Sequence, residues 1–273
     1  MTVPQPRGKS GALWQYDSRS DLHSKVGCWG VLFDLLQQSR VLRQHAQAGK
    51  VIFGVNFEMR DFQTGRKKNL DLVIARPSGA VSSFSLADLA AEWKIVLTPQ
   101  QHVALAALPA LYKGDVGAVL MALEAKAAMT AYSKARPRLY DELNSSHLTV
   151  HGASRQALAV GLVLVNSSST FVSPVQNRAN PPGQGGTLTF SRHNQPADTL
   201  SIIEKVREIP RRTGASTNGY DGLGVVVVNA VNDNVAPVTL VTVPPAVRVG
   251  DVLHYDTMVT RVANEYDTTF QHI

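Results

Sequence analysis

The stretch VLMALEAK at residues 119–126 is an apolar run that ends with a carboxylate and an amine two residues apart. If this run is a strand, alternate side chains lie on one face, so Glu124 and Lys126 share a face and Ala125 points away. A second run, NLDLVI at residues 69–74, places Asp71 among apolar residues. Two carboxylates and a lysine that meet at a sheet edge can hold a divalent cation and a water beside a phosphate. The two runs therefore predict a metal-dependent nuclease.

The spacing of Glu124 and Lys126 carries little information by itself, because about one such triplet is expected by chance in a chain of this size. Residues 92–94, EWK, repeat the spacing within a stretch of helical composition. On a helix, residues i and i+2 do not face each other, so this second pair cannot converge. The strand-like run before Glu124 and the helical composition after Lys126 select residues 124–126.

Composition indicates a folded chain with a substantial core. The sequence has 273 residues, of which 44% are hydrophobic and 18% are charged; a charged share below about 25% argues against a disordered or coiled-coil chain. The single cysteine, Cys28, excludes a disulfide framework and a cysteine-rich zinc site. The N-terminus lacks an apolar signal-peptide core, and no apolar stretch approaches the roughly 18 residues of a membrane span. We therefore expect a cytoplasmic protein without a membrane partner.

The positive charge is concentrated in the first half of the chain. Residues 1–150 hold 18 Lys and Arg against 12 Asp and Glu, whereas residues 151–273 hold 9 of each. The excess thus lies in the half that contains Asp71, Glu124 and Lys126. A basic surface around a site suits a polyanion such as DNA or RNA. Ordinary solubility charge is an equally good explanation of a net charge of +6 on this length of chain.

Periodicity and turn residues predict an alternation of helices and strands. In chain order the expected elements are helix 22–48, strands 51–59 and 69–76 joined by a polar turn at 63–68, helices 85–94 and 99–112, strand 117–126, a helical region 127–146 interrupted by Pro137, strand 157–166, a long loop 167–197, helix 198–209, strands 223–230 and 237–243, and a last helix ending near residue 268. This alternation predicts an α/β fold with a central mixed β-sheet flanked by helices.

The order helix, hairpin, strand, helix, strand over about residues 22–166 resembles the PD-(D/E)XK, or restriction-endonuclease-like, nuclease superfamily, whose hairpin carries the Asp and whose next strand carries Glu-x-Lys. The resemblance implies metal ligation by Asp71 and Glu124 and a catalytic Lys126. The backbone carbonyl of Ala125 could add a third oxygen ligand. A desolvated lysine beside a metal can have a lowered pKa, which would let Lys126 act as a base.

Many members of that superfamily carry a further acidic residue, for which Asp34 on the first helix is the best position and Glu58 on the first hairpin strand a weaker one. Leu70 precedes Asp71 where the family name has Pro. The gap of 53 positions from Asp71 to Glu124 requires an inserted helical segment at about 78–116. We therefore expect a single domain of residues 1–273, with its core at 22–166 and a C-terminal extension at 167–273.

Basic residues on both sides of the predicted site are candidates for contacts with nucleic-acid phosphates. They are Lys67 and Lys68 at the hairpin turn and Lys134, Arg136 and Arg138 after the third strand. A solvated helix face or hairpin tip explains the same residues without a ligand. His147 and His151 have the i, i+4 spacing of two ligands on a helix, but packing or a cap is the favoured interpretation.

These observations predict an endonuclease that uses Mg²⁺, or Mn²⁺ in its place, to hydrolyse phosphodiester bonds, with double-stranded DNA as the expected partner. Cutting both strands would favour a homodimer. Two alternatives stay open: a non-catalytic nucleic-acid-binding or assembly protein that keeps the fold, and an unrelated α/β protein in which residues 124–126 match by accident.

Overall fold

A computed structural model describes residues 5–7, 11–62, 64–214 and 217–273; Gln63 of the predicted turn lies outside them. The helices are α1 (Leu22–Gln38), α2 (Arg40–Gln47), α3 (Leu86–Glu92), α4 (Pro99–Ala107), α5 (Tyr132–Ala153), α6 (Ala197–Arg207) and α7 (Tyr255–Thr269). The strands are β1 (Gln5–Arg7), β2 (Ala12–Trp14), β3 (Ile52–Arg60), β4 (Lys67–Ser85), β5 (Tyr112–Ala128), β6 (Leu158–Asn166), β7 (Thr170–Val172), β8 (Phe190–Arg192), β9 (Gly222–Asn229) and β10 (Thr239–Leu240).

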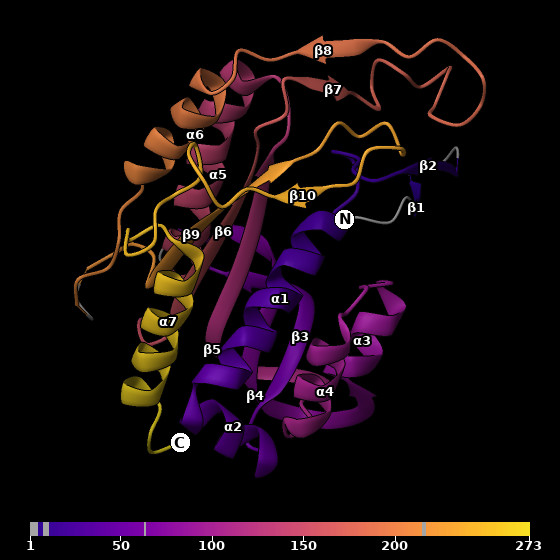
Figure 1. The fold of residues 1–273 in the computed structure, drawn as a ribbon. Coiled ribbons are helices and arrows are strands. Elements are labelled where there is room, and N and C mark those ends of the chain that lie inside the picture. Colours follow the sequence, from indigo (N-terminus) through magenta and orange to yellow (C-terminus); the bar gives the residue numbers. More distant parts are fainter. Residues whose placement is uncertain (1–4, 8–10, 63, 215–216) are drawn as a thin grey trace.

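A mixed sheet of β3, β4, β5, β6, β9 and β10 forms the centre of the molecule (Figure 1). β3 and β4 form an antiparallel hairpin, and β5 continues the sheet antiparallel to β4. β6 is parallel to β5, and β9 is parallel to β6. The α/β prediction with a mixed central sheet is confirmed.

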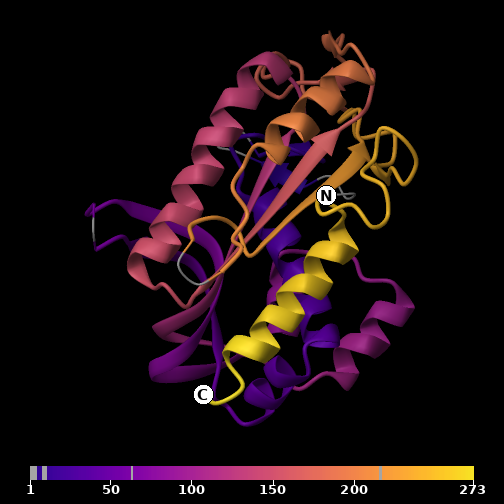
Figure 2. The same cartoon turned by 90° about the vertical axis from the view of Figure 1, so that its left-hand side faces the viewer.

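Helices cover both faces of this sheet. On one face, α1, α2 and α7 pack on strand residues such as Leu72, Met121 and Leu162. On the other face, α5 and α6 pack on residues such as Val163 and Val225, and Figure 2 shows α5 and α7 on opposite sides of the strands. β6 is buried along its whole length because both of its faces are covered, which explains its almost continuous apolar sequence.

The 78–116 segment differs from the predicted helical insertion. β4 continues to Ser85 and β5 begins at Tyr112, so both ends of the 78–116 segment are strand. The two strands pair from Leu72–Leu123 to Ser85–Tyr112, with several register shifts. The helices of this segment are α3 and α4, which connect the far end of β4 to the start of β5 (Figure 1). Because the two long strands pair antiparallel along this length, the triplet 124–126 lies near Asp71 although 53 positions separate Asp71 from Glu124.

α5 runs without a break from Tyr132 to Ala153, although its sequence contains Pro137 and Gly152. The prediction of an interruption at Pro137 and an end near residue 146 was therefore wrong. Val150 contributes to the core and His147 and His151 are buried, so tertiary packing extends the helix beyond the length that its composition predicts. Among the described residues, none of the helices combines the length and apolar character that crossing a membrane requires.

Candidate functional site

The central sheet divides where β4 and β5 stop pairing. The register between these strands ends at Leu72–Leu123. Beyond that pair, the first residues of β4 pair with β3, whereas residues 124–128 of β5 pair with β6. We call this opening, with Asp71, Glu124, Ala125 and Lys126, the fork. The predicted site residues of the two strands thus lie at one place in the sheet.

A break in strand geometry directs Asp71 into the fork. Leu70 packs with the α5 side of the core and Leu72 with the α1 side, although residues two apart on a regular strand share a face. Asn56 lies between the pairs Val55–Leu72 and Phe57–Leu70, opposite Asp71, and has a left-handed φ of 51°. A left-handed residue interrupts the pleat, and the alternation of side chains changes at this point.

The Asp71 carboxylate links α1 to β5. Its Oδ2 accepts a hydrogen bond of 2.9 Å from the backbone N–H of Ala125, and its Oδ1 accepts one of 3.1 Å from the Ser24 hydroxyl. Ala125 is the residue between Glu124 and Lys126, so Asp71 is positioned directly against that triplet. Since the N–H and C=O of one residue in an extended strand point to the same side, the Ala125 carbonyl lies on the same edge. Burial raises the pKa of Asp71, and its two hydrogen bonds and Lys126 oppose that rise.

Glu124 is almost completely buried, with 3% of its side chain exposed. Its Oε1 lies 2.6 Å from the Lys126 Nζ and 3.9 Å from the Lys68 Nζ. Its Oε2 is buried and has no hydrogen-bond partner among the described residues. Burial raises the pKa of Glu124, Lys126 opposes the rise, and the Asp71 charge adds to it. An unpaired carboxylate oxygen in this position is a group that a cation would satisfy.

Lys126 remains a cation in this arrangement. Burial acts to lower its pKa, but the charge and hydrogen bond of Glu124 outweigh burial, and the pKa lies above its ordinary value. The Glu142 carboxylate on α5 lies 3.7 Å from the Lys126 Nζ and adds to this effect. Lys126 as a base, with its pKa lowered beside a bound metal ion, stays a prediction. Its ammonium group suits the stabilisation of negative charge.

A groove of about 690 Å³ opens beside the fork. Its walls are the segment from Tyr16 to α1, the end of β5, the first turns of α5 and the segment after β7. Asp71, Ala125 and Lys126 line it, whereas the buried Glu124 side chain does not. Arg19 is a further cation on the wall. The groove is large enough for a nucleotide-sized group, since ligand sites typically measure about 300–1,000 Å³.

The predicted phosphate-binding residues have different environments. Lys134 and Arg138 line the groove, but Arg138 forms a 2.6 Å ion pair with Glu142. Arg136 is exposed on α5 and does not line the groove. Of the set on α5, Lys134 is the cation best placed for a phosphate in the groove.

The hairpin lysines also differ from each other. Lys67 forms an exposed 2.7 Å ion pair with Glu58. Lys68 is turned inward, where it donates a hydrogen bond to the Glu142 carbonyl oxygen and lies near Glu124. Burial lowers the pKa of Lys68, while Glu124 opposes that change. Lys68 thus belongs to the charge network behind the fork, which the sequence did not indicate.

The structure does not bring the two candidate additional acids to the fork. Asp34 accepts a 2.5 Å hydrogen bond from the Tyr255 hydroxyl of α7, and Glu58 pairs with Lys67 on the exposed hairpin. Asp34 lies on the part of α1 that faces α7, because α7 packs against α1. Besides Glu124, the acid that lies near Lys126 is Glu142 on α5, which the sequence did not indicate.

A cation at the fork would have few protein ligands. Among the described residues, no group of three or more His, Cys, Asp or Glu side chains has the arrangement of a metal site. The proposed ligands at the fork differ from such a group because they include only two carboxylates, those of Asp71 and Glu124. The third ligand would be the backbone carbonyl oxygen of Ala125. Mg²⁺ commonly binds through one or two carboxylates and takes water and substrate phosphate as its remaining ligands. Searches of family models, curated proteins and solved structures found no match to this chain.

Proposed function

We propose that the protein is a Mg²⁺-dependent nuclease that hydrolyses phosphodiester bonds at the fork, with DNA in the adjoining groove. The observation that carries the proposal is the buried, unpaired Oε2 of Glu124 beside Asp71 and Lys126. Leaving a buried carboxylate oxygen without a partner costs on the order of 1–3 kcal/mol or more. A bound cation would remove that cost, which explains why such a group is present.

The residues of the fork fit a hard divalent cation. Asp71 and Glu124 would supply carboxylate oxygens and Ala125 its carbonyl oxygen, which are the ligand types that Mg²⁺ and Mn²⁺ take. When bound, the cation would lower the pKa of a water molecule and polarise a phosphate oxygen.

The remaining residues would position the substrate and stabilise charge. The Lys126 ammonium faces the groove edge and would donate to the non-bridging oxygen that becomes more negative as water attacks phosphorus. Glu142 and Glu124 keep Lys126 protonated and oriented. Lys134 and Arg19, on the groove wall, would contact phosphates on either side of the scissile bond.

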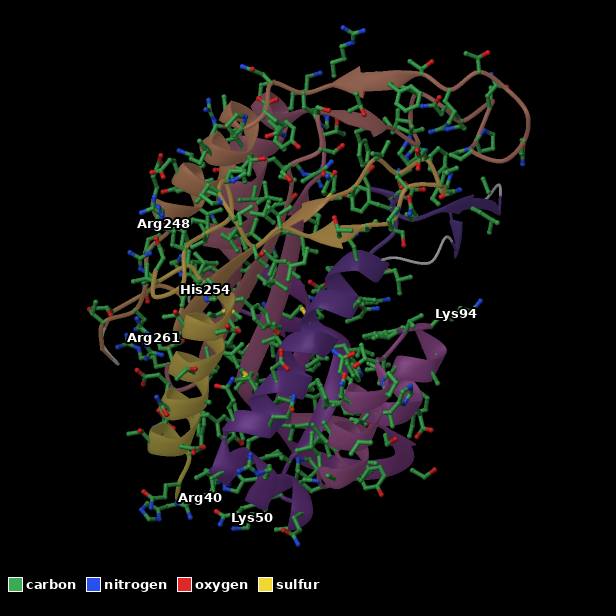
Figure 3. All side chains as sticks on the ribbon, in the orientation of Figure 1. Arg40, Lys50, Lys94, Arg248, His254 and Arg261 are labelled. Carbon is green, nitrogen blue, oxygen red and sulfur yellow. The ribbon has the colours of Figure 1, made fainter. Side chains whose placement is uncertain are left out.

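The proposal is tested by incubating the protein with supercoiled plasmid DNA and Mg²⁺, beside Lys126→Ala. We expect nicked and linear products with the wild-type protein, no products in EDTA, and a loss of at least about 100-fold in Lys126→Ala. Lys94→Ala is the matched control, because Lys94 lies on the α3 side of the molecule with its side chain in solvent (Figure 3).

Three results are distinguished by this experiment. Cleavage that is lost in Lys126→Ala but kept in Lys94→Ala supports the nuclease. Retained DNA binding without cleavage of any DNA or RNA supports a binding or assembly protein. In such a protein the ion pairs of Lys126 with Glu124 and Glu142 would have a structural role. Neither cleavage nor binding contradicts both.

A further inference from the structure

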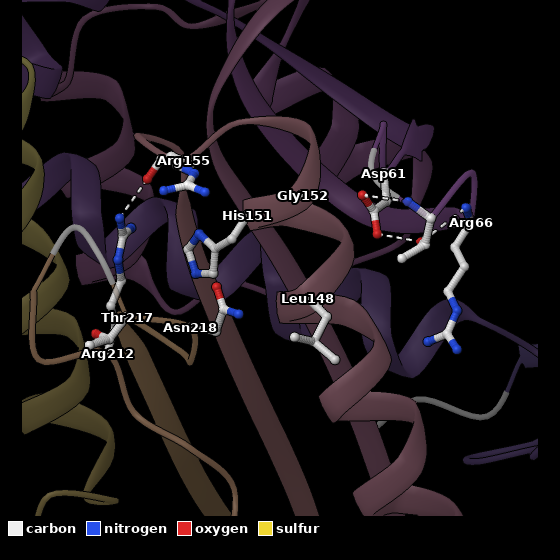
Figure 4. A pocket seen from close by; sticks show the side chains of 10 residues that line it. Asp61, Arg66, Leu148, His151, Gly152, Arg155, Arg212, Thr217 and Asn218 are labelled. Carbon is white, nitrogen blue, oxygen red and sulfur yellow. Dashed lines mark hydrogen bonds between the residues drawn. The ribbon is translucent and has the colours of Figure 1, made fainter.

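A second cavity lies at the C-terminal end of α5, in a part of the molecule that the proposed nuclease does not use. Its volume is about 220 Å³, below the usual range of about 300–1,000 Å³ for drug-sized ligands, so it suits a group the size of phosphate. Asp61, Arg66, His151, Arg155, Arg212 and Asn218 are among the residues that line it (Figure 4). We call it the arginine cavity.

Three arginines and one carboxylate, that of Asp61, are among the described residues that line the cavity. Buried Arg212 lies 3.4 Å from Asp221, which compensates its charge. The Asp61 carboxylate accepts hydrogen bonds from the backbone and hydroxyl of Thr64. Arg155, by contrast, has no carboxylate within 4.0 Å among the described residues. Arg155 and His151 both line the cavity, and in Figure 4 the Arg66 side chain points away from them.

His151 supplies a hydrogen-bond acceptor. Its Nε2 is 2.7 Å from the Gly219 carbonyl oxygen, and because a carbonyl only accepts, Nε2 carries the hydrogen. Its Nδ1 therefore has a lone pair, which is buried and has no partner among the described residues. Gly219 has a φ of 146°, and a Cβ there would lie 2.7 Å from the carbonyl carbon of Arg211. The turn that places this carbonyl against His151 thus requires glycine.

A ligand for this cavity must satisfy two groups of opposite character. The Arg155 guanidinium is a donor that prefers an anionic oxygen, and it can use two N–H groups at once. The His151 Nδ1 needs a donor. Hydrogen phosphate has both features, since it carries anionic oxygens and one P–O–H group. Sulfate has the same shape and charge but no O–H, and a phosphodiester has no O–H either.

We propose that the arginine cavity binds a hydrogen-phosphate group, from inorganic phosphate or from the singly protonated form of a terminal phosphomonoester, whose second pKa is about 6. The anionic oxygens pair with Arg155, and the P–O–H donates to the His151 Nδ1. The Asn218 amide, on the cavity wall, is a further donor for an anionic oxygen. This site is independent of the nuclease proposal and selects against the diester backbone of nucleic acid.

Isothermal titration of inorganic phosphate and of sulfate into the full chain tests the proposal, in EDTA so that no metal bridges the anion to the fork. We expect one phosphate site per chain and at least about tenfold weaker binding of sulfate, for the loss of one hydrogen bond to a buried acceptor. Equal affinities for the two anions, or no phosphate binding at millimolar concentration, would overturn the proposal.

Variants locate the site. Arg155→Ala should weaken phosphate binding at least about tenfold, and Arg248→Ala, which removes an exposed arginine elsewhere (Figure 3), should leave it unchanged. Arg155 is exposed, so its loss should not alter the thermal unfolding of the ligand-free protein. Unchanged phosphate binding in Arg155→Ala contradicts the assignment.

Two further ligands distinguish the sources of the group. A thymidine dinucleotide with a 5′-phosphate that binds tighter than inorganic phosphate indicates a terminal phosphomonoester. Binding of inorganic phosphate without binding of that dinucleotide indicates free phosphate. The 5′-hydroxyl dinucleotide should not bind in either case, and if it competes with phosphate the proposed selectivity is wrong.

Discussion

The fork and the arginine cavity lie along the same helix, α5, but their chemistry is opposite. Glu142 reaches the fork and His151 reaches the cavity, so the two are separated by about 14 Å along the helix axis at 1.5 Å per residue. At the fork, the unpaired buried atom is a carboxylate oxygen of Glu124; in the cavity it is the neutral Nδ1 of His151. Similar burial therefore favours a cation at one end and a protonated anion at the other.

Burial also shifts the pKa values of the two regions in opposite directions. Burial raises the pKa of Asp71 and Glu124, and burial lowers the pKa of His147 and His151. In each case the uncharged form is favoured. Nearby charges modify this effect: Lys126 favours the charged form of Glu124, and at His151 the charge of Asp221 favours protonation while the smaller effect of Arg212 opposes it. Burial is the largest effect on the pKa of Asp71, Glu124 and His151, so the chemistry of the buried group itself decides which ligand each region suits.

The largest expected difference between the regions is in DNA cleavage. Asp71→Asn and Glu124→Gln should each reduce cleavage at least about 100-fold, because each removes an anionic ligand of the catalytic cation. Arg155→Ala should leave cleavage within about twofold, since it acts only on the cavity. Asp141→Asn, an exposed acid on α5, is the matched control. Plasmid nicking rates measure all four, and comparable losses in Arg155→Ala and Asp71→Asn would remove the distinction between the regions.

Acid should destabilise the cavity end of α5. Burial, followed by the charge of His151, lowers the pKa of His147 from 6.5 to about 4. Between these values the unfolded chain binds a proton that the folded protein does not, so the free energy of unfolding falls as the pH falls; below about 4 both states are protonated. His147 accounts for a loss of at most about 3 kcal/mol.

Urea unfolding of the wild-type protein and of His147→Gln across this range measures the effect. The variant should lose less stability on acidification, and an identical pH dependence would show that His147 is not buried in its neutral form. Asp71 and Glu124 have the opposite sign, because their raised pKa values favour protonation in the folded state. Asp71→Asn should therefore not reduce the acid sensitivity.

A clash should disturb the cavity without affecting the fork. A Cβ on Gly152 would lie 2.3 Å from the Asp61 Oδ1, so Gly152→Ala should destabilise the protein by about 1–3 kcal/mol. Gly30→Ala is the control, since a Cβ there meets no atom within 4 Å and alanine favours a helix by about 0.5–1 kcal/mol. Denaturant unfolding measures both. Phosphate binding should weaken in Gly152→Ala while cleavage remains, and loss of cleavage would contradict the independence of the two regions.

The smallest expected effect is that of a single groove lysine on DNA affinity. Lys134 lines the groove, whereas Lys67 is paired with Glu58 on the hairpin. Lys134→Ala should weaken DNA binding severalfold and reduce the slope of log affinity against log salt by about 1, as expected for one lost phosphate contact. Lys67→Ala should change neither. Equal effects of the two variants in a salt titration would place the DNA outside the groove.

The sequence predicted the features that depend on local pattern. Alternation identified the strand ending in Glu124 and Lys126, and turn residues identified the hairpin that carries Asp71. The register then follows from burial, because slipping a strand by one residue would expose its apolar face. The roles of Asp71, Glu124 and Lys126 in catalysis stay predictions.

The features that the sequence did not predict depend on contacts between distant segments. Asp34 meets Tyr255, which is 221 residues away in the chain, because α7 packs on α1. The left-handed residue opposite Asp71 is Asn56, a residue type that adopts this conformation more readily than most, but the strand-like sequence around it does not reveal the break. The arginine cavity combines the hairpin turn, the end of α5 and the segment after Arg212. No single stretch of sequence contains enough of these groups to suggest a site.

Direct titration of Mn²⁺ into the protein by calorimetry tests the central claim, which is that the fork holds one divalent cation between Asp71 and Glu124. We expect one ion per chain, at least about tenfold weaker binding in Asp71→Asn, and unchanged binding in Asp141→Asn. Absence of binding to the wild-type protein, or equal binding to Asp71→Asn, would contradict the account.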